Sequence, residues 1–189
     1  MGDQSDLVVR TAPDPCLRYV AHPVLVIDDT VRSLMDRMLA AMYAHKGIGL
    51  AAPQVGIAQQ IVVIDIGTRS DPIHQEEEIS NPGPFRMVNP TIIWRSTETI
   101  LFNEGCLSIP DIRGEVKRSA HVRVQYQDEH NQLCALDAKS MLAVCVQHEL
   151  DHLNGVLFID HLSPMRRELI GRKLHKRDRQ RQKEKGSGS

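Results

Sequence analysis

The stretch "MLAVCVQHELDHLNG" (Met141–Gly155) decides how the rest of the chain must be arranged. Its pattern predicts a helix from about Ala138 to Leu153, and the Asn-Gly pair that follows is a typical helix stop. The first six residues are apolar, so this helix has no purely polar side. A helix that is apolar on nearly every side is buried, so we expect the other elements to surround it.

The same helix carries the spacing H-E-x-x-H, formed by His148, Glu149 and His152. On a helix this spacing places two imidazoles on one face with a carboxylate close by. Burying these groups is costly unless a partner compensates, and a metal ion is the obvious partner. A catalytic zinc-type centre needs three protein ligands and one open position, so a third ligand must come from elsewhere.

Three positions must be considered for the third ligand. One protease family places a histidine six residues after the second histidine of the motif, where this chain has Phe158, which cannot bind metal. Another takes a glutamate from a following helix, and Glu168 is available in the polar setting "RRELIGRK". Cys106, in "NEGCLSIP", offers a thiolate, which binds borderline and soft divalent metals well. Cys106 is the stronger candidate, and Glu168 remains an alternative.

The remaining patterns predict one amphipathic helix, several strands and a basic C-terminal helix. Strand patterns follow one another without intervening helices, which favours an α+β fold with antiparallel or mixed sheets around the central H-E-x-x-H helix. The predicted elements are a helix within Asp28–Gly47, a shaped loop at Gly47–Gly56, a strand within Gln59–Gly67, a strand-turn-strand unit in Phe85–Pro110 and a hairpin in Ser119–Ala138.

The charge is distributed unevenly along the chain. A net charge of −1 conceals a C-terminal segment, residues 165–189, that holds 10 Lys/Arg and 3 Asp/Glu. We expect a metallohydrolase domain at 1–164, a basic helix at 165–185 and a flexible tail at 186–189. An acidic, proline-containing insert around 70–84 reads as a surface loop. A charge run is usually a solvated face, and docking to the ribosome is the functional alternative.

The chain has no apolar run long enough to span a bilayer and no secretory signal pattern at its start. Its four cysteines form no C-x-x-C pair. A reducing compartment is therefore expected, with free thiols or a thiolate ligand in place of disulfides.

Three segments resemble, in order and spacing, the signature motifs of peptide deformylases: "GIGLAAPQ" (Gly47–Gln54), "EGCLS" (Glu104–Ser108) and "QHELDH" (Gln147–His152). The resemblance runs from about Leu7 to the basic C-terminal helix. "CLSIP" and "HLNGVLF" fit the bacterial-type subgroup best. The acidic insert is longer than this subgroup usually carries at that place.

The resemblance implies a divalent metal held by Cys106, His148 and His152, with water in the fourth position. Fe(II) is the implied native metal, and Ni, Co or Zn are possible substitutes. The implied reaction removes the formyl group from N-formylmethionine on nascent polypeptides, in the bacterial cytoplasm rather than an organelle. We expect no membrane partner, since no apolar run could span a bilayer, and no sequence-specific nucleic-acid partner.

The chemistry assigns further roles around this metal. Glu149 is placed to accept a proton from water and to deliver it to the leaving amine. By resemblance, the side-chain amide of Gln54 and the backbone N–H of Leu107 stabilise the negative charge on the formyl oxygen.

The methionine side chain needs an apolar pocket, and residues 141, 144, 145 and 148 share one helix face. The pocket candidates, which could equally be plain core, are Ile48, Phe102, Met141, Val144 and Cys145. Gly49 and Gly105 could pair with an extended peptide through backbone groups. Arg113 and Glu104 complete the predicted substrate-binding set, a solvated side chain being the equal alternative for Arg113.

Three other functions stay open at this point. A zinc peptidase using Glu168 would cleave internal peptide bonds. A thiol hydrolase would use Cys106 as nucleophile with a histidine as base. A non-enzymatic ribosome or RNA binder would rely on the basic C-terminal segment.

Overall fold

The computed structural model describes residues 7–67, 69–70, 78–79 and 83–186. The end of the predicted flexible tail, 187–189, lies outside these residues. Most of the predicted insert at 70–84 also lies outside them. Only two short strands of that region are described, β3 (Arg69–Ser70) and β4 (Glu78–Ile79), and they pair antiparallel.

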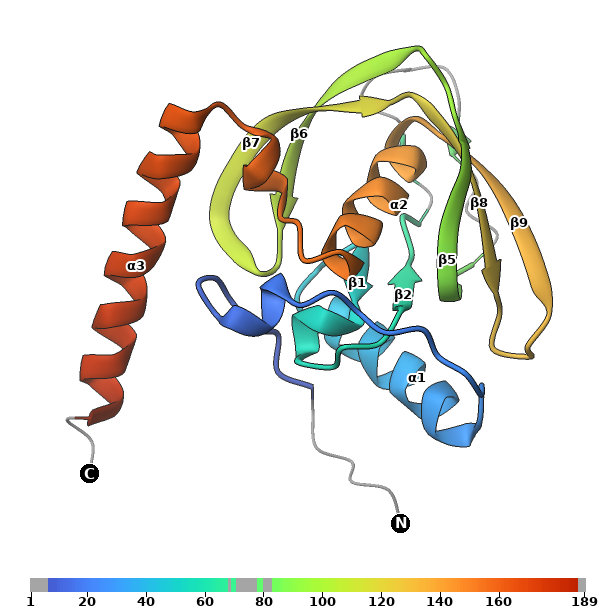
Figure 1. The fold of residues 1–189 in the computed structure, drawn as a ribbon, viewed down its shortest axis with the longest axis horizontal. Coiled ribbons are helices and arrows are strands. Elements are labelled where there is room, and N and C mark those ends of the chain that lie inside the picture. The colour runs from blue at the N-terminus through green and yellow to red at the C-terminus, as the bar shows by residue number, and fades with distance from the viewer. Residues whose placement is uncertain (1–6, 68, 71–77, 80–82, 187–189) are drawn as a thin grey trace.

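The main sheet has five strands in the order β1-β2-β5-β8-β9, and each neighbouring pair is antiparallel. These strands are β1 (Gly49–Ala51), β2 (Ile61–Ile64), β5 (Phe85–Arg95), β8 (His121–Gln127) and β9 (Leu133–Lys139). A separate hairpin joins β6 (Thr99–Cys106) to β7 (Ile109–Ser119). Figure 1 shows helix α2 (Ser140–Leu153) at the centre, with β5, β8 and β9 on one side and the β6–β7 hairpin on the other.

Helix α2 is buried as its apolar pattern predicts. Ala143 and Val146 pack in one cluster with Val62 and Ile64 of β2 and with Val122 of β8. The helix ends at Asn154, and Gly155 follows with φ +70°, so the Asn-Gly stop signal is confirmed.

Helix α1 (Asp29–Ala44) covers the opposite face of β1 and β2. The Asp28 carboxylate caps its start by accepting a hydrogen bond from the Val31 N–H at 3.0 Å. Its methionine stripe, with Met38 fully buried, packs against Val63 of β2 and Leu50 of β1. Strand β2 is therefore buried on both faces, between α1 and α2, which explains its continuous Ile/Val sequence.

The segment 85–110 forms two strands as predicted, but they do not pair with each other. Strand β5 pairs with β2 and β8, whereas β6 pairs with β7. The predicted loop at 47–56 contains the short strand β1 and a 3-10 helix, η2 (Ala52–Val55). The hairpin at 119–138 forms as β8 and β9.

The C-terminal helix, α3 (Pro164–Gly186), follows a 3-10 turn, η3 (Phe158–His161). Leu174 of α3 packs with Phe158 and with Ile112 of β7 in a third apolar cluster. A further 3-10 turn, η1 (Pro15–Arg18), adds Leu17 to it. The predicted α+β fold class is confirmed, while the division of the chain at residue 164 remains a prediction. No helix in the described part of the chain has the length and apolarity needed to cross a membrane.

Candidate metal centre and adjoining groove

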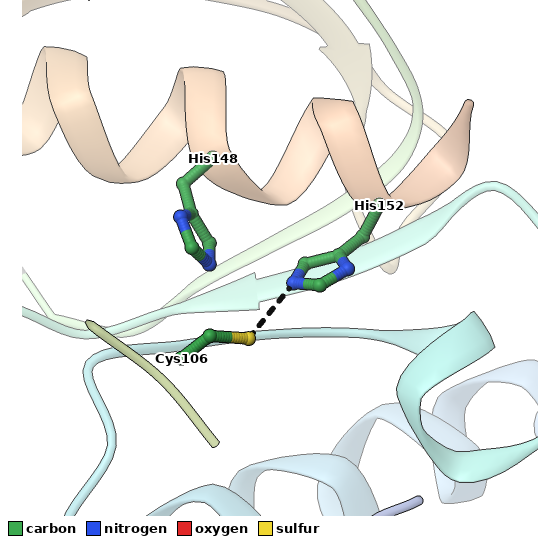
Figure 2. A group of neighbouring side chains, drawn as sticks. All are labelled: Cys106, His148 and His152. Atoms are coloured by element: carbon green, nitrogen blue, oxygen red, sulfur yellow. Dashed lines mark hydrogen bonds between the residues drawn. The ribbon is translucent and has the colours of Figure 1, made fainter. Parts of the chain in front are cut away.

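Three side chains from two elements converge at the centre of the molecule. Cys106 ends strand β6, and His148 and His152 lie one turn apart on α2. Their possible ligand atoms all lie within 4.8 Å of one another, and Cys106 Sγ is 3.2 Å from His152 Nε2. Figure 2 shows both imidazoles directed towards the thiol. Within the described residues, no other group of three such side chains meets.

The tautomer of His148 follows from its hydrogen bond to Glu104. The Nδ1 atom of His148 lies 2.7 Å from Glu104 Oε2. Burial would raise the pKa of this carboxyl, but hydrogen bonds from His148 and Arg118 lower it to about 2. An ionised carboxylate only accepts hydrogen bonds, so Nδ1 carries the hydrogen and Nε2 is left with its lone pair for a metal.

The electrostatics of the two histidines suit a cation between them. Burial lowers the pKa of His152 well below its usual value, which keeps that imidazole neutral. Burial would also lower the pKa of His148, but hydrogen bonds to Cys106 and Glu104 raise it well above its usual value. The negative surroundings that hold a proton on His148 would equally favour a metal ion there. A thiolate with two imidazoles is a ligand set that borderline divalent metals accept, so the residues fit the implied metal.

Glu149 is buried beside this cluster. The residue is 3% exposed, and its Oε2 atom has no hydrogen-bond partner among the described residues. Burial raises the pKa of this carboxyl to about 7. A carboxyl group that titrates near neutral pH suits general acid–base chemistry.

The Gln54 side chain is held with its amide nitrogen facing the cluster. Its Oε1 atom accepts a hydrogen bond from the Ala51 N–H at 2.8 Å. Its Nε2 atom donates to Ser108 Oγ at 3.1 Å and lies 3.5 Å from Cys106 Sγ. The Gln54 amide can therefore donate a hydrogen bond to a group bound at the cluster.

A groove of about 1570 Å³ opens onto the cluster. It is lined by every residue predicted to bind substrate, namely Ile48, Gly49, Phe102, Glu104, Gly105, Arg113, Met141, Val144 and Cys145. Gln54, Cys106, Leu107, His148 and Glu149 line it as well. His152 is not among the lining residues and is 1% exposed, so it lies behind the other two predicted ligands.

Residues 7–168 match the polypeptide deformylase family. The chain belongs to that family. The peptide deformylase of Phenylobacterium zucineum is 44% identical over 89% of this chain and 94% of its own length. That of Methylocella silvestris is 45% identical over 87% of this chain and 81% of its own length.

Solved deformylase structures share the fold. The crystal structure of the Ehrlichia chaffeensis peptide deformylase has a TM-score of 0.83 at 35% identity, covering 93% of this chain and 98% of that one. The same enzyme in complex with actinonin gives a TM-score of 0.84 at 36% identity, covering 93% and 99%. The predicted resemblance is confirmed, and the chain is a hydrolase of a metalloenzyme family. Membership supports removal of the N-formyl group from nascent peptides.

The structure decides one of the alternatives that the sequence left open. Glu168 lies exposed on α3, where it pairs with Arg172, and it is not part of the ligand cluster. A peptidase centre built on Glu168 is therefore excluded. All four cysteines are free, as predicted, and Cys145 is buried with its Sγ atom 3.7 Å from the Ile48 carbonyl oxygen.

Two of the predicted substrate-binding residues, Glu104 and Arg113, already form hydrogen bonds with other groups of the protein. Both carboxylate oxygens of Glu104 accept hydrogen bonds from Arg118 and His148. This geometry favours a role in orienting His148 over direct contact with substrate. Arg113 is exposed and donates a hydrogen bond to the Asn103 carbonyl oxygen at 2.8 Å.

Sequence reasoning missed several polar residues at this deformylase site. Arg118 is buried there, yet no motif or spacing in the sequence points to it, and Ser108 is buried at the end of the "EGCLS" motif without having been assigned a role. The position of Asp151 could have been predicted from the sequence, because it lies three residues after His148 and so shares a helix face with it. The N-terminal segment 7–11 and the α3 residues Asp178, Arg181 and Gln182 also line the groove without any signal in the sequence.

Proposed function

We propose that this chain hydrolyses the N-formyl group of N-formylmethionyl nascent polypeptides, using one divalent metal ion held by Cys106, His148 and His152. The convergence of these three side chains beside the buried carboxyl group of Glu149, whose Oε2 atom has no hydrogen-bond partner among the described residues, carries the proposal. When bound, such a cation lowers the pKa of water and polarises a carbonyl oxygen. Fe(II) is the proposed native metal, and Ni, Co or Zn are proposed substitutes.

The proposed proton carrier is Glu149. Because burial holds its pKa near neutrality, its carboxylate can take a proton from water and return it to the departing amine. Glu104 holds His148 in the tautomer whose Nε2 lone pair faces the cluster. The thiol-hydrolase alternative needs one imidazole as a base for Cys106, whereas two imidazoles lie with this sulfur in a set of three possible ligand atoms within 4.8 Å of one another, which favours a ligand role.

Charge on the formyl oxygen would be stabilised by the Gln54 amide and the Leu107 backbone N–H. Anchoring of Gln54 by Ala51 and Ser108 supports this role, because a donor already held in place needs no reorganisation during the reaction. The apolar groove residues Ile48, Phe102, Met141, Val144 and Cys145 are proposed to receive the methionine side chain, and Gly49, Gly105 and Arg113 the peptide backbone.

An assay of formate release tests this function. Protein purified without oxygen is given a formyl-Met tripeptide, its N-acetyl counterpart and an unblocked peptide, with metal content measured on the same sample. We expect rapid formate release from the first and no cleavage of internal bonds. Absence of formate release from protein that carries one metal per chain would refute the proposal.

Two coarser settings belong to the same proposal. Bacterial relatives support the bacterial cytoplasm as the compartment. The exposed basic residues of α3, among them Lys173, Lys176 and Arg179, are proposed to meet the ribosome. Changing these three to Gln preserves the buried Leu174, so unchanged cosedimentation with ribosomes at low salt would remove α3 from that contact.

A further inference from the structure

A chain of hydrogen bonds leads from His148 to the protein surface. Glu104 accepts from His148 at 2.7 Å and from Arg118 Nε at 2.7 Å and Nη2 at 3.0 Å. Arg118 Nη1 donates to Asp151 Oδ2 at 2.6 Å. The same oxygen lies 2.7 Å from His161 Nε2. Three side chains, Glu104, Arg118 and Asp151, thus connect the predicted metal ligand His148 to His161, the last residue of η3.

Exposure increases along this chain. The side chains of Glu104 and Arg118 are 3% and 5% exposed, that of Asp151 is 25% exposed and that of His161 is 37% exposed. His148 and Asp151 lie on one face of α2, three residues apart, and hold the Glu104–Arg118 pair of the β6–β7 hairpin between them. His161 is therefore the most solvent-exposed side chain of this hydrogen-bonded chain.

The direction of the last hydrogen bond is fixed by chemistry. An ionised carboxylate only accepts, so Nε2 of His161 must carry hydrogen and donate to Asp151. An N–H nitrogen cannot accept from Arg118 Nη1, so the 3.4 Å approach of those two atoms is no hydrogen bond. Because Nε2 holds hydrogen in the charged imidazole and in this neutral tautomer, the contact does not depend on protonation.

We propose that His161 is a positioning residue for the metal ligand His148, acting through Asp151, Arg118 and Glu104. His161 and Arg118 share one oxygen of Asp151, so the histidine limits rotation of that carboxylate and of the guanidinium it holds. The guanidinium fork then fixes the Glu104 carboxylate, which orients the His148 ring. The inference rests on the proposed function only in taking His148 as a metal ligand.

The test is the rate at which zinc leaves the loaded protein for a chromogenic chelator. His161→Phe keeps a ring and removes the N–H, whereas His161→Gln keeps an N–H near the position of Nε2. Loss of an outer partner of a ligand typically weakens metal binding about 10- to 100-fold, and we expect the lower end, about 10-fold faster release, for His161→Phe. His161→Gln should stay near the wild-type rate. So should the matched control His130→Phe, on the exposed β8–β9 turn.

A double-mutant comparison shows whether the effect passes through the chain. In a Glu104→Gln background the connection to His148 is already altered, so adding His161→Phe should accelerate release no further. An Arg118→Lys background serves the same purpose if Glu104→Gln does not fold. The inference would be overturned if His161→Phe accelerated zinc release equally in the wild-type protein and in the variant background. It would also be overturned if His161→Phe alone released zinc at the wild-type rate. Formate release by the wild-type protein is measured separately, so failure of the proposed function and failure of this inference are distinguishable.

Discussion

Gly49 on β1 and Glu149 on α2 lie so close that a Cβ atom at position 49 would stand 2.4 Å from Glu149 Oε1. The same Cβ would stand 2.9 Å from Cys145 Sγ. Neither distance is possible for a real carbon, so any side chain at position 49 must displace the carboxylate. The glycine therefore lets the sheet edge approach the proposed acid–base residue.

Gly49→Ala should disable turnover while leaving the metal in place. A misplacement of about 1 Å in a reacting group can cost on the order of 100-fold in rate, and we expect a loss of at least that size in kcat. Steady-state kinetics and metal analysis on the same sample provide the check. Gly171→Ala is the matched control, because a Cβ at that helical position meets nothing within 4 Å. Normal turnover by Gly49→Ala would show that Glu149 need not stay where the structure places it.

Glu149→Ala and Glu149→Gln should keep the metal and lose deformylation. General acid–base catalysis typically contributes about 100- to 10,000-fold, and we expect kcat to fall within that range. Formate release and elemental analysis measure the two properties. A variant with nearly normal turnover would remove Glu149 from the mechanism.

The metal-free protein should also gain stability from Glu149→Gln at alkaline pH. Burial raises the pKa of Glu149 to about 7 from its ordinary value of 4.5, so the neutral form favours the fold. This contribution is fully present below about pH 4.5 and is lost as the pH rises through 7. At pH 8 the ionised wild-type carboxylate costs up to about 3 kcal/mol, which the variant avoids.

Denaturant unfolding of chelator-treated protein at pH 5 and pH 8 measures this difference. We expect the stability advantage of Glu149→Gln over wild type to be larger at pH 8. Glu104 does not confuse the comparison, because its pKa lies at about 2 and its contribution is lost only at more acidic pH. An advantage that is the same at both pH values would contradict the assigned shift.

Cys106→Ala should weaken metal binding by more than about 100-fold, the upper range for loss of an outer partner alone. The physical reason is that two imidazoles remain where three ligands are needed. Metal per chain after dialysis against a weak chelator measures the effect. Cys134→Ala on β9, outside the cluster, should retain the wild-type content. Full metal content in Cys106→Ala would refute the ligand assignment.

Gly155→Ala should destabilise the fold without touching the groove. Gly155 has φ +70°, and a Cβ there would lie 2.5 Å from the Arg18 carbonyl oxygen. Left-handed backbone costs about 1–2 kcal/mol for other residues, and overpacking adds about 1–3 kcal/mol. Gly171→Ala should instead stabilise by roughly 1 kcal/mol, because Gly is a poor helix former. Chemical denaturation of both variants should therefore give changes of opposite sign.

The sequence alone determined the features that depend on residues near one another in the chain. The helix from 140 to 153, its Asn-Gly end and the placing of His148, Glu149 and His152 on it follow from a period of 3.6 residues. The motif around Cys106 identified the third member of the cluster, and the three motifs together identified the family.

Only the tertiary structure decided which distant residues meet. In the folded chain β6 pairs with β7 and not with β5. Arg118 forms hydrogen bonds with Glu104 and Asp151, and Gly49 lies in close contact with Glu149. No periodic pattern encodes such contacts, because strand partners and close approaches depend on how complete elements pack. The ligands could therefore be read along the chain, whereas the side chains that hold them in place had to be found in space.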